Sequence, residues 1–136
     1  MKPEGKMIEG LAHVGVAFKN LDEGIAFFEE KFGGELITSL GDDGKMNFGL
    51  HISAMVKVGT LMFELMEPTQ EGVGPVGKFI AERGEGIHHI SLKVDDYKSA
   101  KSDFESKALS ILDAGGAMGF IHPKSAKGIL VEFTEI

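Results

Sequence analysis

The 136-residue chain contains no cysteine, no long apolar run and no excess of positive charge. The absence of cysteine excludes disulfides, thiolate metal ligands and a cysteine nucleophile. No stretch approaches the roughly 20 apolar residues that cross a bilayer, and no charged-then-apolar leader opens the sequence, so we expect a cytoplasmic protein without a membrane partner. The net charge of −7 argues against nucleic acid as a partner, because phosphate binding requires a basic face.

The composition and length of the chain are those of one ordinary globular domain. Hydrophobic residues make up 43% and charged residues 26%, which is a typical soluble mixture. The length allows one core and no second domain of ordinary size. Any bound metal must be held by His, Asp, Glu or amide oxygen. No nucleophile elbow, phosphate loop or dinucleotide-binding fingerprint is present.

The sequence repeats itself once. Residues 13–21 align with residues 89–97, and residues 63–67 resemble residues 131–135 in their pattern of apolar, polar and ionisable types. A repeat of this kind predicts two copies of one supersecondary unit.

Each copy is predicted to be a βαβββ unit. The alternation of apolar and polar residues predicts strands, and the apolar stripe that follows Asn20 predicts a helix with a capping box. The first copy is expected to have a strand, a helix and three strands over 11–18, 21–32, 35–40, 46–58 and 60–66. The second is expected to have the same order over 87–94, 96–107, 109–113, 117–121 and 128–134. A short connecting helix containing Val76, Phe79 and Ile80 is predicted to end at Gly84.

Two histidines occupy matching positions at the start of the first strand of each copy. His13 and His89 lie on the face opposite to the apolar residues of their strands. Small residues, Gly15 and Ser91, follow two positions later on the same face, which indicates room for a bound group.

Two glutamates occupy matching positions within apolar strands. Glu64 lies in residues 61–66 and Glu132 in residues 129–133. An ionised carboxylate in such a strand costs several kcal/mol unless a cation or hydrogen bonds compensate it. The repeat pairs each glutamate with the histidine of its own copy. Two histidines and two glutamates on one face would form a divalent metal site with open positions for a substrate.

Structural explanations compete with the metal site. A lone strand histidine is more often a hydrogen-bonded structural residue, and a lone glutamate often points to solvent. The matched pairs favour metal. His88 has the opposite strand parity to His89 and is expected to be structural, whereas His51 and His122 stay undecided. The seven methionines are expected to fill the core rather than to bind a soft metal.

The paired units and the His–Glu–His–Glu order resemble the vicinal oxygen chelate superfamily, which has the glyoxalase and bleomycin-resistance fold. Within it the chain is most similar to the methylmalonyl-CoA epimerase family, over nearly its whole length. The similar segments are 11–17, 64–68, 75–80, 83–90, 94–96, 121–125 and 128–132.

The resemblance implies an α+β fold in which two βαβββ modules pair into one curved, cup-like mixed sheet with helices on the outer face. We expect a single domain over residues 1–136. Its first module covers about 8–68, its linker helix about 75–84 and its second module about 87–136.

The resemblance also implies an activity. It implies a metal-dependent epimerase or isomerase of a CoA thioester, which removes a proton through a metal-stabilised enediolate. The implied ligands of the divalent ion (Co, Mn, Ni, Zn or Mg) are His13, Glu64, His89 and Glu132, and Glu132 is also the implied catalytic carboxylate. An acyl-CoA substrate and, by analogy, a homodimer are expected.

Two departures from the family leave alternatives open. Family members can carry a second carboxylate on the strand before that of Glu64, yet no Asp or Glu lies between Asp43 and Glu64, so His51 or a water could substitute. Residues 112–118 are shorter than the glycine-rich loop usual in the epimerases. A lactoylglutathione lyase of the glyoxalase type and a non-catalytic binding protein of the bleomycin-resistance kind are the alternatives. The His122–Ser125 segment favours the CoA thioester.

Overall fold

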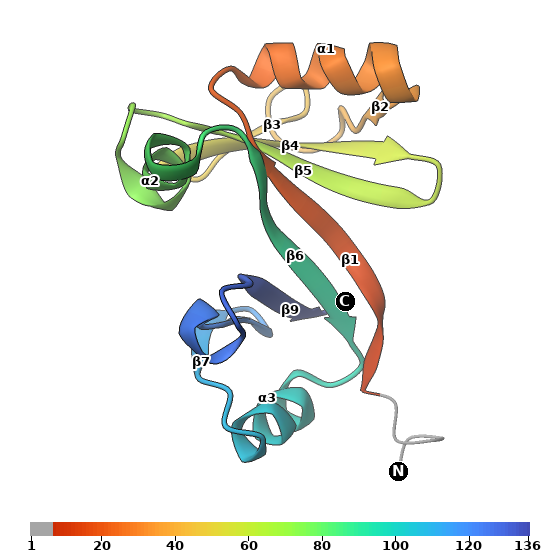
Figure 1. Ribbon diagram of the computed structural model, residues 1–136. Coiled ribbons are helices and arrows are strands. Elements are labelled where there is room, and N and C mark those ends of the chain that lie inside the picture. Colours follow the sequence, from red (N-terminus) through yellow and green to blue (C-terminus); the bar gives the residue numbers. More distant parts are fainter. Residues whose placement is uncertain (1–6) are drawn as a thin grey trace. The chain divides into compact units, whose positions relative to one another are not determined.

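The computed structural model describes residues 7–136 (Figure 1). Over these residues the elements are β1 (Ile8–Ala17), α1 (Leu21–Phe32), β2 (Glu35–Leu36), β3 (Lys45–Asn47), β4 (His51–Val58), β5 (Leu61–Pro68), α2 (Gly74–Arg83), β6 (Gly86–Val94), α3 (Tyr97–Ser106), β7 (Ile111–Gly115), β8 (Met118–Ile121), the 3₁₀ turn η2 (Pro123–Ser125) and β9 (Val131–Glu135). The strand order is β2-β4-β5-β1-β6-β9-β8-β7, with β3 beside β4. The α+β class and the single mixed sheet are therefore confirmed.

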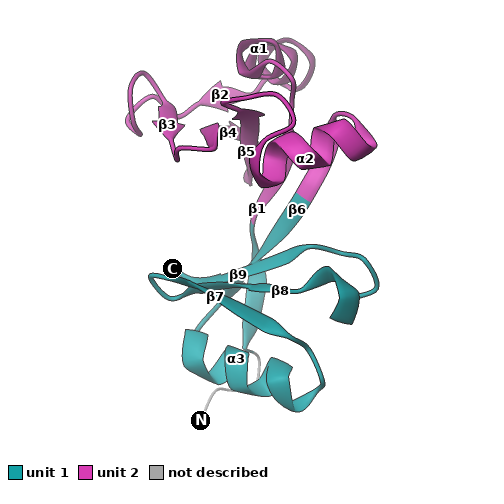
Figure 2. Ribbon diagram, turned by 90° about the vertical axis from the view of Figure 1, so that its left-hand side faces the viewer, with its two compact units in different colours: residues 1–12, 89–136 teal, residues 13–88 magenta. Residues whose placement is uncertain are grey.

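The described chain divides into two compact units (Figure 2). Unit 2 comprises residues 13–88, and unit 1 comprises residues 89–136 together with the beginning of β1 up to Ala12. Contacts of this beginning of β1 with β6 and with the residue that follows it accompany its grouping with unit 1. The backbone N–H of Asp95 donates to the carbonyl of Met7 at 3.1 Å, and Lys93 Nζ lies 3.8 Å from Glu9 Oε1.

Unit 2 packs α1 on one face of its strands. β1 runs parallel to β5, and β5 runs antiparallel to β4. The core between these strands and α1 is formed by the buried residues Val16, Leu21, Ile25, Phe28, Ala54, Val56 and Leu65. Strand residues two apart share a face, so this core fixes which residues of β1 and β5 lie on the opposite face.

Unit 1 repeats this arrangement with α3. β6 runs parallel to β9, and β9 runs antiparallel to β8. Phe133 is fully buried at the centre of the core, with Phe104 edge-on at 5.0 Å and Tyr97 stacked on it at 5.1 Å between ring centroids. The core is therefore built on the face of β9 that Phe133 occupies, and neighbouring residues of β9 lie on the other face.

The first turns of α1 and α3 are held by matching contacts. Asn20 accepts a hydrogen bond from the backbone N–H of Glu23 at 2.9 Å, as the capping box predicted, and Asp96 accepts one from Ser99 at 2.9 Å.

A second carboxylate reaches each of these helices from the last long strand of its unit. Glu67 Oε1 accepts from the N–H of Leu21 at 2.6 Å, and Glu135 Oε1 accepts from the N–H of Tyr97 at 2.7 Å. The predicted repeat is thus present in the hydrogen bonds as well as in the element order.

α2 lies on the other face of the unit 2 strands from α1. Its residue Val76 packs with Ala17 and Met66, which have the strand parity opposite to that of the α1 core. The helix ends before Gly84, whose N–H donates to the carbonyl of Ile80 at 2.8 Å, so the predicted end is confirmed. Within each unit, α1 or α3 therefore covers the core face of the strands, and in unit 2 α2 packs against the opposite face.

Three predicted strands are shorter than expected, and one of them is the predicted strand 128–134, which begins only at Val131 as β9. The predicted strand 46–58 is interrupted between β3 and β4, where Gly49 has φ of +92° and its N–H donates to Asn47 Oδ1 at 2.8 Å. A left-handed backbone with a side-chain turn cannot continue a strand. The predicted strand 35–40 is limited to β2, because residues 38–40 form a turn and a bend.

Among the helices of residues 7–136, none combines the length and the apolar character needed to span a bilayer.

Candidate functional site

The strand register of unit 2 brings His13 and Glu64 together. Gly15 on β1 lies directly beside Glu64 on β5 in the parallel ladder, and His13 shares the face of Gly15. This face is opposite to the α1 core. His13 Nε2 lies 3.3 Å from Glu64 Oε1, so the predicted pair of the first repeat is present.

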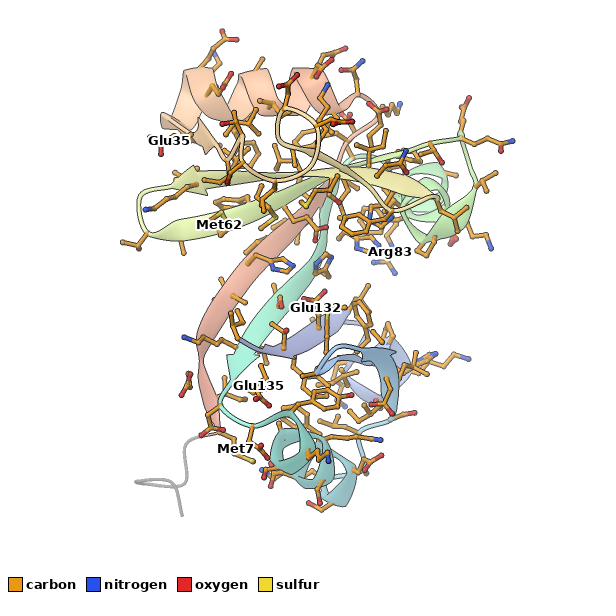
Figure 3. The ribbon with its side chains drawn as sticks, turned by 180° about the vertical axis from the view of Figure 1, so that it is seen from behind. Met7, Glu35, Met62, Arg83, Glu132 and Glu135 are labelled. Atoms are coloured by element: carbon orange, nitrogen blue, oxygen red, sulfur yellow. The ribbon has the colours of Figure 1, made fainter. Side chains whose placement is uncertain are left out.

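Unit 1 holds the corresponding pair. Ser91 on β6 lies directly beside Glu132 on β9, which is the register that Gly15 and Glu64 have in unit 2. His89 Nε2 lies 3.9 Å from Glu132 Oε1. Figure 3 labels Glu132 on β9, together with Glu135 toward the end of the same strand. All four residues predicted as ligands therefore take part in a histidine–glutamate pair within their own unit.

The donor atoms of each pair suit a divalent ion. Imidazole nitrogen and carboxylate oxygen bind such ions at about 2.0–2.2 Å, so two donors on one ion lie about 3–3.5 Å apart. The 3.3 Å separation of His13 and Glu64 falls in this range, and the 3.9 Å separation of His89 and Glu132 is slightly wider.

Both pairs are largely removed from solvent. The side chains of His13 and Glu64 are 16% and 15% exposed, and those of His89 and Glu132 are 5% and 8% exposed. A carboxylate in such surroundings requires a positive charge or hydrogen bonds to compensate its lost hydration. The histidine of each pair can provide part of this compensation when it is protonated, and a bound cation can provide more.

Two serines provide hydrogen bonds to the glutamates. Ser53 Oγ donates to Glu64 Oε2 at 2.7 Å, and Ser91 Oγ donates to Glu132 Oε2 at 2.6 Å. Both serines are 0% exposed. The small side chain of Ser91, which was predicted to leave room for a bound group, also holds the neighbouring carboxylate.

Sequence reasoning missed both serine contacts. For Ser91 a signal was available, since a hydroxyl residue two positions after His89 on one strand face lies beside Glu132 if the strands are parallel. Ser53 carries no comparable signal, because its contact depends on the exact register of β4 and β5.

The other histidines lie in different surroundings. His88 packs edge-on against Phe79 of α2 at 5.0 Å between ring centroids, which fits the structural role predicted for it. His51 lies opposite Pro68 in the ladder of β4 and β5, and Glu64 lies opposite Met55. His51 and Met55, the residue opposite Glu64, are four residues apart on β4, or about 13 Å along the strand.

His122 precedes η2 and caps it. Its Nδ1 accepts a hydrogen bond from the backbone N–H of Lys124 at 3.1 Å. This contact requires that Nδ1 carry no proton.

Three methionines of unit 2 share the face of His13 and Glu64 instead of filling the core. Met55 lies opposite Glu64, Met46 lies opposite Ser53, and Met62 has the same strand parity as Glu64. Each of the three is half-buried, and Figure 3 labels Met62 on the side of β5 away from α1. The prediction that the methionines fill the core is wrong for these residues.

Comparison with known proteins identifies the family and agrees with the fold. Residues 12–125 match the family model described as "Glyoxalase/Bleomycin resistance protein/Dioxygenase superfamily". The mitochondrial methylmalonyl-CoA epimerase of Dictyostelium discoideum is 29% identical over 133 residues, which cover 92% of this chain and 77% of that protein.

Two solved structures have a closely similar fold. The methylmalonyl-CoA epimerase of Mycobacterium tuberculosis has a TM-score of 0.82 at 27% identity, covering 99% of this chain and 92% of that one. A variant of the Streptomyces coelicolor methylmalonyl-CoA epimerase in complex with 2-nitronate-propionyl-CoA has a TM-score of 0.79 at 27% identity, covering 94% and 98%. The predicted resemblance is confirmed, and the chain belongs to the glyoxalase/bleomycin resistance protein/dioxygenase superfamily.

Proposed function

We propose that this chain is a metal-dependent epimerase of a CoA thioester, of the kind that acts on methylmalonyl-CoA. The observation that carries the proposal is the matched histidine–glutamate pair, which occurs once in each unit at equivalent strand positions. The similarity of the chain to methylmalonyl-CoA epimerases, one of them in complex with 2-nitronate-propionyl-CoA, supports the choice of substrate.

The proposed ligands are His13, Glu64, His89 and Glu132, all bound to one divalent ion. Nitrogen and oxygen donors of this kind suit Co, Mn, Ni, Zn or Mg. When bound, the ion supplies positive charge to the thioester and carboxylate oxygens of the substrate, which makes the proton between them more acidic. Each unit supplies one histidine and one glutamate at equivalent strand positions to this proposed set.

Glu132 is the proposed residue that transfers the proton on one face of the substrate carbon, while a second group acts on the opposite face. Its side chain is only 8% exposed, and its Oε2 is held by Ser91. A carboxylate that is held in one orientation and shielded from water is suited to proton transfer. Glu64 resembles it in chemistry but has about twice the side-chain exposure, 15%.

The second acid or base of an epimerase is not a carboxylate on β4 in this chain. No Asp or Glu lies between Asp43 and Glu64. The position of His51, about 13 Å along the strand from the place opposite Glu64, does not favour it as the partner of that site. A water therefore becomes the better proposal for the second proton transfer.

A substrate comparison tests the proposal. The purified protein, loaded with Co²⁺ or Mn²⁺, is incubated with one epimer of methylmalonyl-CoA and separately with the hemithioacetal of methylglyoxal and glutathione. The proposal expects epimerisation of the first compound and no conversion of the second. Conversion of the second alone would identify a lactoylglutathione lyase, and binding without conversion of either would identify a binding protein.

The homodimer and the cytoplasmic location stay predictions. Sedimentation equilibrium of the purified protein would test the dimer.

A further inference from the structure

Two buried serine hydroxyls contact the glutamates of the proposed site without being proposed ligands of the metal. Ser53 and Ser91 are both 0% exposed. Burying a hydroxyl is unfavourable unless it is hydrogen-bonded, and each of these donates to a glutamate at 2.7 or 2.6 Å. The hydrogen bond to a carboxylate therefore compensates the burial of each serine hydroxyl.

Both serines contact the same oxygen of their glutamate. In unit 2 the hydroxyl takes Oε2 of Glu64, and Oε1 lies toward His13. In unit 1 the hydroxyl takes Oε2 of Glu132, and Oε1 lies toward His89. Each carboxylate is thus held with one defined oxygen on the side of its histidine.

The two serines come from different places in the repeat. Ser91 belongs to β6, the parallel neighbour of β9, whereas Ser53 belongs to β4, the antiparallel neighbour of β5. The position in unit 2 that corresponds to Ser91 is Gly15, which has no side chain. The same contact has therefore been built twice, from two unrelated positions. This duplication indicates that the orientation of the carboxylate matters, because simple inheritance from the repeat does not explain it.

We infer that Ser53 and Ser91 are positioning residues, which hold Glu64 and Glu132 so that each presents Oε1 alone to the metal. The inference rests on the proposed function. Neither serine needs to touch the ion or the substrate, since each acts through its glutamate. Groups that orient the ligands of a metal in this way typically change metal affinity by about 10- to 100-fold when they are removed.

Titration with Co²⁺ tests the inference without an activity assay. The visible absorption of bound Co²⁺ depends on the number and geometry of its ligands. Ser91→Ala and Ser53→Ala release Oε2, so we expect affinity to fall by about tenfold or more and the absorption spectrum to change. Ser102→Ala is the matched control, because Ser102 is an exposed serine on α3, and its affinity and spectrum should equal those of the wild type.

Ser91→Gly provides a second variant in case Ser91→Ala folds poorly. β1 already accepts glycine at the equivalent position, Gly15, so the strand pairing tolerates it. The expected loss of affinity and change of spectrum are the same.

The outcomes separate the inference from the proposed function. If the wild type binds about one Co²⁺ per chain and the serine variants match it in affinity and spectrum, the positioning role is overturned and the metal site stands. If the wild type binds no Co²⁺, the metal site and the inference both fail. Weaker binding and an altered spectrum in both serine variants, with Ser102→Ala unchanged, support the inference.

Discussion

Unit 1 and unit 2 contain the same histidine–glutamate pair, but the two pairs differ in their exposure to solvent. The histidine and glutamate side chains are 5% and 8% exposed in unit 1, but 16% and 15% exposed in unit 2. Charges interact more strongly where water is excluded. A duplicated fold can therefore keep one set of donor atoms in two different surroundings, and this difference is the reason for proposing Glu132, the less exposed carboxylate, for proton transfer.

The residues that lie opposite the two glutamates on the adjacent strands also differ, in how rigid their side chains are. Met55 lies opposite Glu64, and Phe120 lies opposite Glu132. Methionine is flexible and adapts to what lies beside it, whereas a phenylalanine ring has few conformations. Glu132 is therefore bordered by the more rigid surface, which suits a group that must stay in one orientation.

The largest expected difference between the two units is in catalysis. Gln keeps an oxygen that can bind a metal, but it cannot accept a proton at neutral pH. Glu132→Gln should retain metal and lose about 10²–10⁴-fold of the exchange of the substrate α-proton, whereas Glu64→Gln should keep much of it. Metal content and exchange rate are measured on the same samples. Equal exchange by the two variants would make Glu132 a ligand only.

The next effect concerns the cores of the units. The core of unit 1 is centred on Phe133, which contacts the rings of both Phe104 and Tyr97. Phe133→Ala should lower the free energy of unfolding by about 3–5 kcal/mol, because it leaves a cavity that the rings cannot close. Urea denaturation measures the change. A loss below about 1 kcal/mol would mean that the core collapses around the cavity or packs differently.

A smaller difference is expected at the matching helix starts. Glu67, which is half-buried, accepts from the N–H of Leu21, and the exposed Glu135 accepts from the N–H of Tyr97. Glu67→Ala should cost about 1 kcal/mol or more, and Glu135→Ala about half of that, since solvent replaces a lost hydrogen bond at an exposed position. Thermal unfolding of the two variants compares them. The reverse order would contradict the assignment of burial.

The smallest effect concerns a tyrosine that unit 2 lacks. Burial, and then its hydrogen bond to Asp113, raises the pKa of Tyr97 to about 12, and the hydrogen bonds from Tyr97 and Lys101 lower the pKa of Asp113. Because the pKa of Tyr97 is raised in the folded protein, its protonated hydroxyl contributes stability at pH values below the ordinary pKa of 10.0. This contribution is lost as the pH rises through about 12. Tyr97→Phe keeps the ring stacked on Phe133, so it should be slightly less stable than the wild type at pH 8, and the difference should shrink in this alkaline range. A difference that stays constant up to pH 12 would exclude ionisation of Tyr97 as its cause.

Much of the fold could be predicted from the repeat and from strand periodicity. The faces of His13 and His89 follow from alternation alone, and the capped start of α1 follows from Asn20 and the residues after it. These features depend on local sequence. The grouping of the beginning of β1 with unit 1 could not be predicted, because it rests on contacts of Met7 and Glu9 with residues far along the chain.

The candidate site was predictable in its charged residues and not in its supports. A carboxylate inside an apolar strand is conspicuous, so Glu64 and Glu132 stand out from the sequence. Serine is common in strands and gives no such signal, and the contact of Ser53 with Glu64 exists only in one register of β4 and β5. The interruption of the predicted strand at Gly49 could not be predicted either, because glycine also occurs within strands and does not by itself mark a break.

Uptake of deuterium at C2 of methylmalonyl-CoA tests the central claim most directly. The wild-type protein is incubated with the substrate in D₂O after metal loading, after chelation, and after return of a divalent ion to the chelated sample. The account predicts uptake of one deuterium per substrate in the loaded sample, loss of uptake on chelation, and its recovery with the ion. Absence of uptake by the metal-loaded protein, or equal uptake by the chelated protein, would contradict it.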